Sequence, residues 1–215
     1  MNGNGASFLK KIFFNINYII SKWIVHVIFS FSYRIDIKKE ANLPSNGPMI
    51  ILPKHQYWTD IPLIMLSFDF PLHFVAKNEL FHSRCARTYL LLAGCLPLDR
   101  DHTIKTLNSF KQLLSLLKEN GKVVIFPEGT YFRDVVGSGK SRLIQMILQF
   151  QCQLEDQIPF IPVGIRYGDK VGWRRSVEIQ IGHPLFAEGK SEADPLTHRA
   201  LGEISRLCHF TSVAT

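Results

Sequence analysis

The stretch MIILPKHQYWTD, residues 49–60, predicts a change from strand to helix with polar side chains at the corner. Its first four residues are apolar, and a short apolar run of this kind is typical of a buried strand. A helix is expected over residues 59–67, with Thr59 or Asp60 near its N-cap. The corner carries His55 five residues before Asp60.

The rest of the chain repeats this alternation of strands and helices. Strands are expected over residues 34–38, 48–53, 72–76, 122–126, 159–166 and 177–181, and helices over 59–67, 79–93, 101–120, 141–153 and 195–208. This order predicts a single α/β domain with a mixed, largely parallel sheet flanked by helices. Such folds bind ligands at the carboxyl ends of their strands. Both KHQYWTD and PEGTYFRD follow an apolar strand directly, so both are expected at that edge.

Residues 8–33, FLKKIFFNINYIISKWIVHVIFSFSY, differ in composition from the rest. On a helical projection four polar residues form one narrow stripe, and aromatic and branched side chains fill much of the remaining surface. Uninterrupted apolar runs of about eighteen residues, which a simple spanning helix needs, do not occur. We therefore expect an amphipathic helix or helical hairpin that lies on a membrane, within an N-terminal segment 1–33 ahead of a domain 34–215. The alternative is a helix or hairpin that packs into the protein core.

The chain carries a formal net charge of +7, which favours polyanionic partners. Nucleic acid, an anionic membrane surface and an acidic carrier protein all meet that description. The four cysteines are widely spaced and form no paired metal-binding pattern, so free thiols in a reducing compartment are expected.

A general base that acts on an alcohol requires at least a histidine held by a neighbouring carboxylate. The carboxylate fixes the tautomer of the imidazole and stabilises the imidazolium that forms when it takes a proton. The G-x-S-x-G pattern of a serine nucleophile is absent from this sequence, which favours direct attack by a hydroxyl of the substrate. The alternative reading places His55 at the surface or at a helix cap.

The stretch FPEGT, residues 126–130, offers a second set of polar groups after a buried strand. Its glycine permits close approach of the backbone to a ligand, and Glu128 and Thr130 can bind the hydroxyl groups of a polar head. The alternative is a turn that happens to be polar.

Four motifs together resemble those of the glycerolipid acyltransferase superfamily. They are H-x-x-x-x-D at residues 55–60, GCLPLDR at 94–100, FPEGT at 126–130 and IPFIPV at 158–163. They occur in the order typical of that family, whose best-known member acylates 1-acylglycerol-3-phosphate, and they span about half of the chain.

The resemblance implies an O-acyltransferase of phospholipid biosynthesis. His55 would deprotonate the hydroxyl of a lyso-glycerolipid, and Asp60 would orient His55. The acceptor that the resemblance favours is 1-acylglycerol-3-phosphate. The hydroxyl would attack the thioester of an acyl-CoA or an acyl carrier protein. A metal or other cofactor is not expected, because the thioester is already activated. The expected partners are the lyso-lipid, the acyl carrier and the cytoplasmic face of a membrane, and not nucleic acid.

The resemblance also implies the residues that hold the acceptor. Arg100 would bind its phosphate, and Glu128, Gly129 and Thr130 would hold its head group. The family motif commonly continues with an arginine, but here the position is Tyr131 and the next arginine is Arg133.

A tyrosine donates one hydrogen bond without charge, whereas an arginine offers phosphate a bidentate fork. Either Arg133 turns toward the phosphate or the acceptor is less anionic, as in an ornithine lipid or a glycolipid. Lys54 also replaces the asparagine that commonly precedes the histidine. A catalytically silent lipid-binding module stays open as an alternative, and a metal hydrolase ranks last because further metal ligands are missing.

Overall fold

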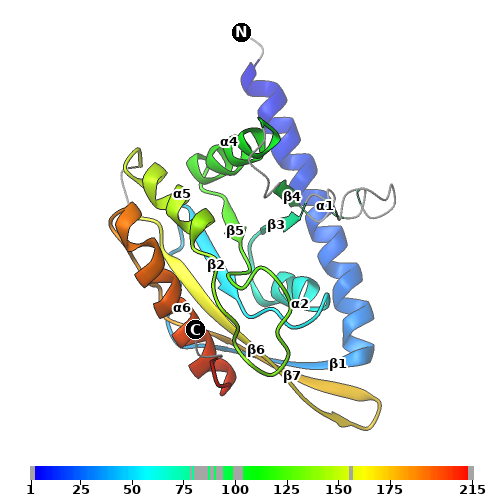
Figure 1. Ribbon diagram of the computed structural model, residues 1–215. Coiled ribbons are helices and arrows are strands. Elements are labelled where there is room, and N and C mark those ends of the chain that lie inside the picture. Colours follow the sequence, from blue (N-terminus) through cyan, green and yellow to red (C-terminus); the bar gives the residue numbers. More distant parts are fainter. Residues whose placement is uncertain are drawn as a thin grey trace.

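The computed structural model describes residues 3–77, 79, 87, 90, 94–98, 104–154 and 157–212. Within them, seven strands form one sheet in the order β1-β7-β6-β2-β5-β3-β4 (Figure 1). The five strands from β6 to β4 are parallel to one another, while β7 runs antiparallel to β6 and β1 runs parallel to β7. The predicted mixed, largely parallel sheet is confirmed. The strands are β1 (Tyr33–Lys39), β2 (Met49–Pro53), β3 (His73–Lys77), β4 (Cys95–Leu98), β5 (Lys122–Val124), β6 (Phe160–Val171) and β7 (Arg174–Ile181).

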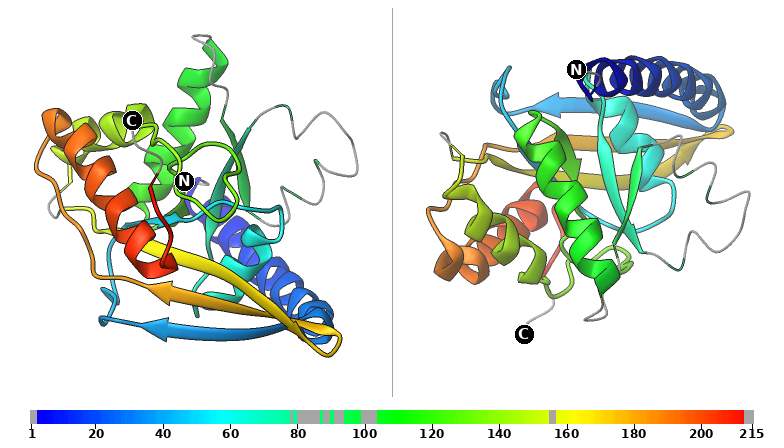
Figure 2. Two further views of the ribbon diagram at one scale, coloured as in Figure 1. Left: turned by 60° about the horizontal axis from the view of Figure 1, so that its bottom comes forward. Right: turned by 90° about the horizontal axis from the view of Figure 1, so that it is seen from above.

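Helices cover both faces of this sheet (Figure 2). Along β2, Met49 and Ile51 pack into the core under α1 and α2, and Ile50 and Leu52 pack into the core under α4, α5 and α6. This alternation follows from the two-residue period of a strand, and it explains why β2 is apolar throughout. The helices are α1 (Gly3–Ser32), α2 (Asp60–Ser67), α4 (Ile104–Lys118), α5 (Arg142–Gln151) and α6 (Ala193–Cys208), with a short 3-10 turn η2 (Lys190–Glu192).

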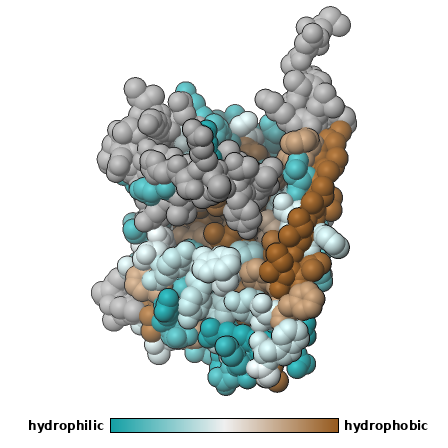
Figure 3. Space-filling view, turned by 90° about the vertical axis from the view of Figure 1, so that its right-hand side faces the viewer, coloured by the Kyte–Doolittle hydropathy of each residue, from teal (hydrophilic) through white to brown (hydrophobic). Residues whose placement is uncertain are grey.

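The N-terminal segment is one continuous helix, and it has two apolar faces. One face packs into the core through Tyr18, Val25 and Phe29, as the core-packing alternative requires. The other face is a row of exposed side chains at helical spacing, which we name the α1 stripe (Figure 3). It consists of Ile12, Phe13, Ile16, Ile19, Ile20, Trp23, Ile24, Ile28 and Phe31.

The segment Ile12–Ser32 of α1 is long enough and apolar enough to cross a membrane, judged by length and composition alone. Only 17% of the apolar stretch within this segment is buried in the protein. Most of this apolar surface therefore faces away from the folded domain.

Strand β4 was not predicted, because Pro97 lies within it. Proline lacks the N–H that a central strand must donate, so it argues against a strand in sequence. The structure places β4 at the edge of the sheet, where Pro97 pairs with Ala76 and proline is tolerated. The predicted helix over residues 79–93 lies largely outside the described residues.

Candidate active site

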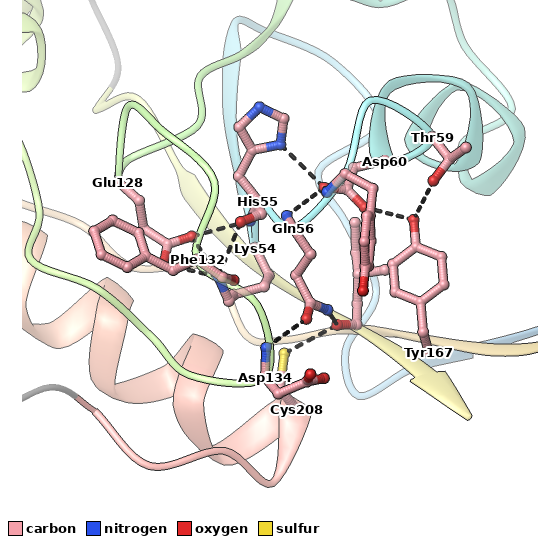
Figure 4. Close-up of polar contacts among 12 residues, drawn as sticks. Lys54, His55, Gln56, Thr59, Asp60, Glu128, Phe132, Asp134, Tyr167 and Cys208 are labelled. Carbon is pink, nitrogen blue, oxygen red and sulfur yellow. Dashed lines mark hydrogen bonds and ion pairs between the residues drawn. The ribbon is translucent and has the colours of Figure 1, made fainter. Parts of the chain in front are cut away.

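The carboxyl ends of β2 and β5 lie at one edge of the sheet because these strands are parallel neighbours. His55 follows β2, and Asp60 is the first residue of α2. His55 Nδ1 lies 3.0 Å from Asp60 Oδ2, so the predicted pair is in hydrogen-bond contact. The side chain of Asp60 is fully buried, whereas that of His55 is 13% exposed. Figure 4 shows the other ring nitrogen, Nε2, turned away from Asp60.

Asp60 is held by donors from its own corner and from β6. Its Oδ2 accepts the backbone N–H groups of Gln56, at 2.5 Å, and Tyr57, at 2.8 Å. Its Oδ1 accepts the hydroxyl of Tyr167 at 2.6 Å. The pKa of Tyr167 is raised, first by burial and then by the charge of Asp60, so its hydroxyl keeps the proton that it donates. These bonds fix the carboxylate that in turn fixes the imidazole.

The expected side-chain cap of α2 is replaced by these contacts. Thr59 occupies the N-cap position but makes no capping hydrogen bond with its side chain. Its hydroxyl instead lies 2.7 Å from that of Tyr167. Asp60 turns back toward the corner rather than along the helix, because the N–H groups of Gln56 and Tyr57 point at its carboxylate.

Glu128, from the loop after β5, is buried together with Lys54. The Lys54 ammonium donates to both carboxylate oxygens of Glu128 at 2.8 Å, and both side chains are 0% exposed. Glu128 also accepts the backbone N–H of His55 at 3.0 Å and that of Gly137 at 2.8 Å. A carboxylate has about four acceptor sites, and these four bonds fill them. The sequence led us to expect that Glu128 holds a head group, but in the structure its carboxylate oxygens bind groups of the protein itself.

Lys54 joins the two loops of the site. Besides Glu128 it donates to the carbonyl oxygens of His55, at 3.0 Å, and Phe132, at 2.7 Å. The N–H of Phe132 in turn donates to the carbonyl of His55 at 3.0 Å. Sequence reasoning missed this role: the substitution of asparagine was the only signal, and nothing local in the sequence marks a lysine as buried.

The His55 ring is enclosed by two aromatic side chains. The ring of Phe126 stacks on it at a centroid distance of 3.8 Å, and the ring of Tyr131 lies tilted against it at 4.3 Å. Tyr131 is 53% exposed, so it forms the outer wall of the site. Burial, followed by the charge of Asp60, raises the pKa of its hydroxyl. Tyr131 thus takes a place beside the imidazole, where the family motif commonly has an arginine.

Arginine side chains gather on the tyrosines next to Asp60. The guanidinium carbon of Arg133 lies 4.8 Å from the ring centroid of Tyr57, and that of Arg175 lies 5.1 Å from the ring centroid of Tyr167. These contacts have cation–π geometry. The side chain of Arg133 is therefore exposed while its guanidinium lies over the ring of Tyr57.

The remaining residues that were predicted to bind the acceptor fall into two groups, inside and outside the described part of the chain. Thr130 is exposed, and Gly129 adopts a φ of +68°, which a side chain would disfavour. These two residues form the turn that leads from Glu128 to Tyr131. Arg100 lies outside the described residues.

The fold and the site define an α/β enzyme with a histidine–carboxylate pair at the carboxyl edge of its sheet. The family model described as Acyltransferase matches residues 34–166, well over half of the 215 residues. The chain therefore belongs to the acyltransferase family, and it is an acyltransferase. The resemblance inferred from the four motifs is confirmed.

Three relatives agree with this assignment. The 1-acyl-sn-glycerol-3-phosphate acyltransferase of Bacillus subtilis (strain 168) is 30% identical over 165 residues, 74% of this chain and 77% of that protein. BAT2, a chloroplastic 1-acyl-sn-glycerol-3-phosphate acyltransferase of Brassica napus, is 29% identical over 91% of this chain and 57% of its own length. LPAT1, a chloroplastic 1-acyl-sn-glycerol-3-phosphate acyltransferase of Arabidopsis thaliana, is 30% identical over 55% of this chain and 33% of its own length.

The crystal structure of the 1-acyl-sn-glycerophosphate (LPA) acyltransferase PlsC from Thermotoga maritima matches with a TM-score of 0.61 at 22% identity. The match covers 87% of this chain and 79% of that one. The two proteins share a fold.

Proposed function

We propose that this acyltransferase moves a fatty acyl group from an acyl thioester to the free hydroxyl of 1-acylglycerol-3-phosphate. The observation that carries the proposal is the contact between the buried Asp60 carboxylate and His55 Nδ1, which leaves Nε2 turned away from Asp60. The names of the relatives support the acceptor.

The proposed reaction begins with a neutral His55 whose Nδ1–H donates a hydrogen bond to the Asp60 carboxylate. Nε2 takes the proton of the acceptor hydroxyl while the hydroxyl oxygen attacks the thioester carbonyl. The tetrahedral intermediate collapses, the carbon–sulfur bond breaks, and the imidazolium returns its proton to the leaving thiolate. Asp60 stabilises the imidazolium between these steps.

We assign the acceptor to the open side of this site. Thr130 and Tyr131 would contact its head group beside the turn at Gly129, and Arg100 and Arg133 would bind its phosphate. Glu128 would act as a positioning residue, because its carboxylate binds Lys54 and the backbone of His55.

The proposed setting is the cytoplasmic face of a membrane. A lyso-lipid is delivered from a bilayer, whereas acyl-CoA and acyl carrier protein are water-soluble, so the reaction needs an enzyme at the interface. The α1 stripe offers the apolar surface for this contact.

The test is transfer of a labelled acyl group, from coenzyme A and from acyl carrier protein, to a panel of lyso-lipids. We expect the highest kcat/KM with lysophosphatidic acid, compared with neutral lyso-lipids of the same chain length. Preference for a neutral lyso-lipid would favour the alternative acceptors that Tyr131 suggests. Absence of transfer by the wild type from either donor, with lipid binding retained, would identify a silent lipid-binding module.

Three substitutions test the assigned roles. Because a general base contributes about 10²–10⁴-fold, His55→Ala should remove nearly all transfer and Asp60→Asn most of it. Both variants should keep the circular dichroism and vesicle binding of the wild type. Rapid turnover in His55→Ala would refute the mechanism, and full activity of Arg133→Ala on lysophosphatidic acid would refute Arg133 as a phosphate ligand.

A further inference from the structure

The hairpin of β6 and β7 projects from the body of the protein (Figure 1). Two large apolar side chains are exposed at its tip. Val171 is 65% exposed and Trp173 is 73% exposed, the latter being the largest exposed fraction among the bulky apolar side chains described. Gly172 lies between them with a φ of +69°, which lets the chain turn tightly. The tip thus presents two apolar side chains to the surroundings.

This tip is attached to the end of the α1 stripe. The guanidinium of Arg174 donates from Nε to the carbonyl oxygen of Ser30 at 2.7 Å, close to the C-terminus of α1. The rings of Trp173 and Phe31 lie with their centroids 6.4 Å apart. Phe31 is the last member of the α1 stripe, so the exposed apolar surface continues from the helix onto the hairpin.

The charges around this surface favour an anionic partner. Lys170, Arg174 and Arg175 flank the tip, with Asp169 as the acidic residue beside them. Residues 3–32 contain neither aspartate nor glutamate. Tryptophan with flanking basic residues is typical of segments that lie at the headgroup level of a bilayer. A bilayer that carries anionic lipids matches this surface in both its apolar and its charged parts.

We propose that the β6–β7 tip is a second membrane contact, with Val171 and Trp173 in the interface and Lys170 at the anionic headgroups. The proposal rests on the membrane association of α1 put forward above. A single helix on a bilayer can roll about its own axis, whereas a second contact at the end of that helix fixes the rotation. The tip would therefore set how the site at His55 faces the lipid surface.

Tryptophan fluorescence tests this contact directly, because the chain has three tryptophans. The variant Trp23→Phe/Trp58→Phe keeps only Trp173, and Trp58→Phe/Trp173→Phe keeps only Trp23. Each is mixed with vesicles of phosphatidylcholine and phosphatidylglycerol that contain brominated phosphatidylcholine. We expect blue-shifted emission from Trp173 and quenching by the brominated lipid, as for Trp23.

The two probes separate the two proposals. Quenching of Trp23 without quenching of Trp173, in protein that sediments with the vesicles, would overturn the hairpin contact and leave the α1 contact standing. Quenching of neither probe would overturn both contacts. Acyl transfer to a short-chain acceptor below its micelle concentration is measured separately, and it depends on neither result.

Substitutions at the tip provide a second test. Lys170→Glu/Val171→Asp should weaken binding to the anionic vesicles about tenfold, since it removes apolar area and reverses a charge. The control Phe186→Ser changes a side chain that is 45% exposed and lies away from the tip in sequence, and it should bind like the wild type. Transfer to a short-chain acceptor below its micelle concentration should be unchanged in both variants. Unaltered vesicle binding by the tip variant would refute the proposal.

Discussion

At the scale of single residues, the site depends on a lysine and a glutamate that are both withdrawn from water. Lys54 and Glu128 are 74 positions apart in sequence, and both side chains are completely buried. A buried charge without a partner is strongly destabilising, whereas a buried pair can be replaced by neutral groups at little expense. Since this pair also holds the backbone of His55, stability and catalysis are coupled here.

The first prediction concerns this pair. Lys54→Met should lower the free energy of unfolding by about 3–5 kcal/mol, because it leaves the Glu128 carboxylate buried and uncompensated. The double variant Lys54→Met/Glu128→Gln should lose less free energy of unfolding than the two single variants lose together. The difference should be up to about 3 kcal/mol. Denaturant unfolding measures both values.

The control for that pair is Lys38→Met, which removes an ion pair with Glu178 in which the lysine side chain is 58% exposed. It should leave the free energy of unfolding nearly unchanged. Additive losses in the double variant at Lys54 and Glu128 would contradict the role assigned to the pair.

The second prediction concerns Tyr131, which covers the imidazole where the family commonly has an arginine. Tyr131→Arg should raise the ratio of kcat/KM for lysophosphatidic acid to that for a neutral lyso-lipid by about tenfold, because a guanidinium offers phosphate two charged donors. Tyr131→Phe keeps the ring against His55 and should leave that ratio unaltered. An equal ratio in Tyr131→Arg and the wild type would exclude this position from phosphate recognition.

At the scale of elements, α1 and β3 meet through a partly buried histidine, His73. The ring of Phe14 stacks on that of His73 at a centroid distance of 4.6 Å. Burial lowers the pKa of His73 to about 4, although its hydrogen bond to the Gly94 carbonyl acts in the opposite direction. The contact between the two elements therefore requires a neutral imidazole.

The third prediction is a loss of stability in mild acid. The unfolded chain binds a proton at His73 near pH 6.5, while the folded chain binds it only near pH 4. Between these values the unfolded state holds more protons, so the free energy of unfolding should fall by about 1.4 kcal/mol per pH unit on acidification. Above pH 6.5 this effect is absent.

The measurement is denaturant unfolding from pH 7 to pH 4.5. His73→Phe keeps the stacking and should flatten the profile, whereas His198→Gln, at an exposed position, should keep the slope of the wild type. An unchanged slope in His73→Phe would assign the acid sensitivity to other groups.

At the scale of the whole molecule, α1 belongs to the core and to the surface at once. Tyr18, Val25 and Phe29 lie in the larger hydrophobic core, and fully burying such side chains is worth roughly 1.5–3 kcal/mol each. Deleting residues 1–30 to test membrane attachment would also open this core. Substitutions in the α1 stripe leave the core face intact and test the membrane contact by itself.

The fourth prediction uses the two faces of α1 against each other. Ile16→Asn/Ile20→Asn should shift the protein from the membrane fraction to the supernatant while its unfolding midpoint stays close to that of the wild type. Val25→Asn should lower the unfolding midpoint and leave the protein in the membrane fraction. It places an unpaired amide in the core, which lowers the free energy of unfolding by roughly 1–3 kcal/mol. Sedimentation and thermal unfolding are measured on the same preparations. Continued pelleting of the Ile16/Ile20 variant would place the membrane anchor elsewhere.

The sequence by itself predicted the α/β class, most strand positions and, with the family resemblance, the pairing of His55 with Asp60. Strand and helix patterns are local, and five residues across one corner leave little freedom in where the two side chains meet. The shared edge of FPEGT and the histidine also followed from the sequence, because parallel strands end on the same side of a sheet.

Only the tertiary structure decided what those residues bind. It filled the acceptor sites of Glu128 with Lys54 and backbone donors, brought the Tyr167 hydroxyl to Asp60 from 107 positions away, and set Trp173 beside Phe31. It also gave α1 its second apolar face, which a periodic pattern cannot assign to core or membrane. The physical reason is common to all of these. The burial and the hydrogen-bond partners of a residue depend on groups that are distant in sequence. The local sequence pattern does not specify which distant groups will contact that residue.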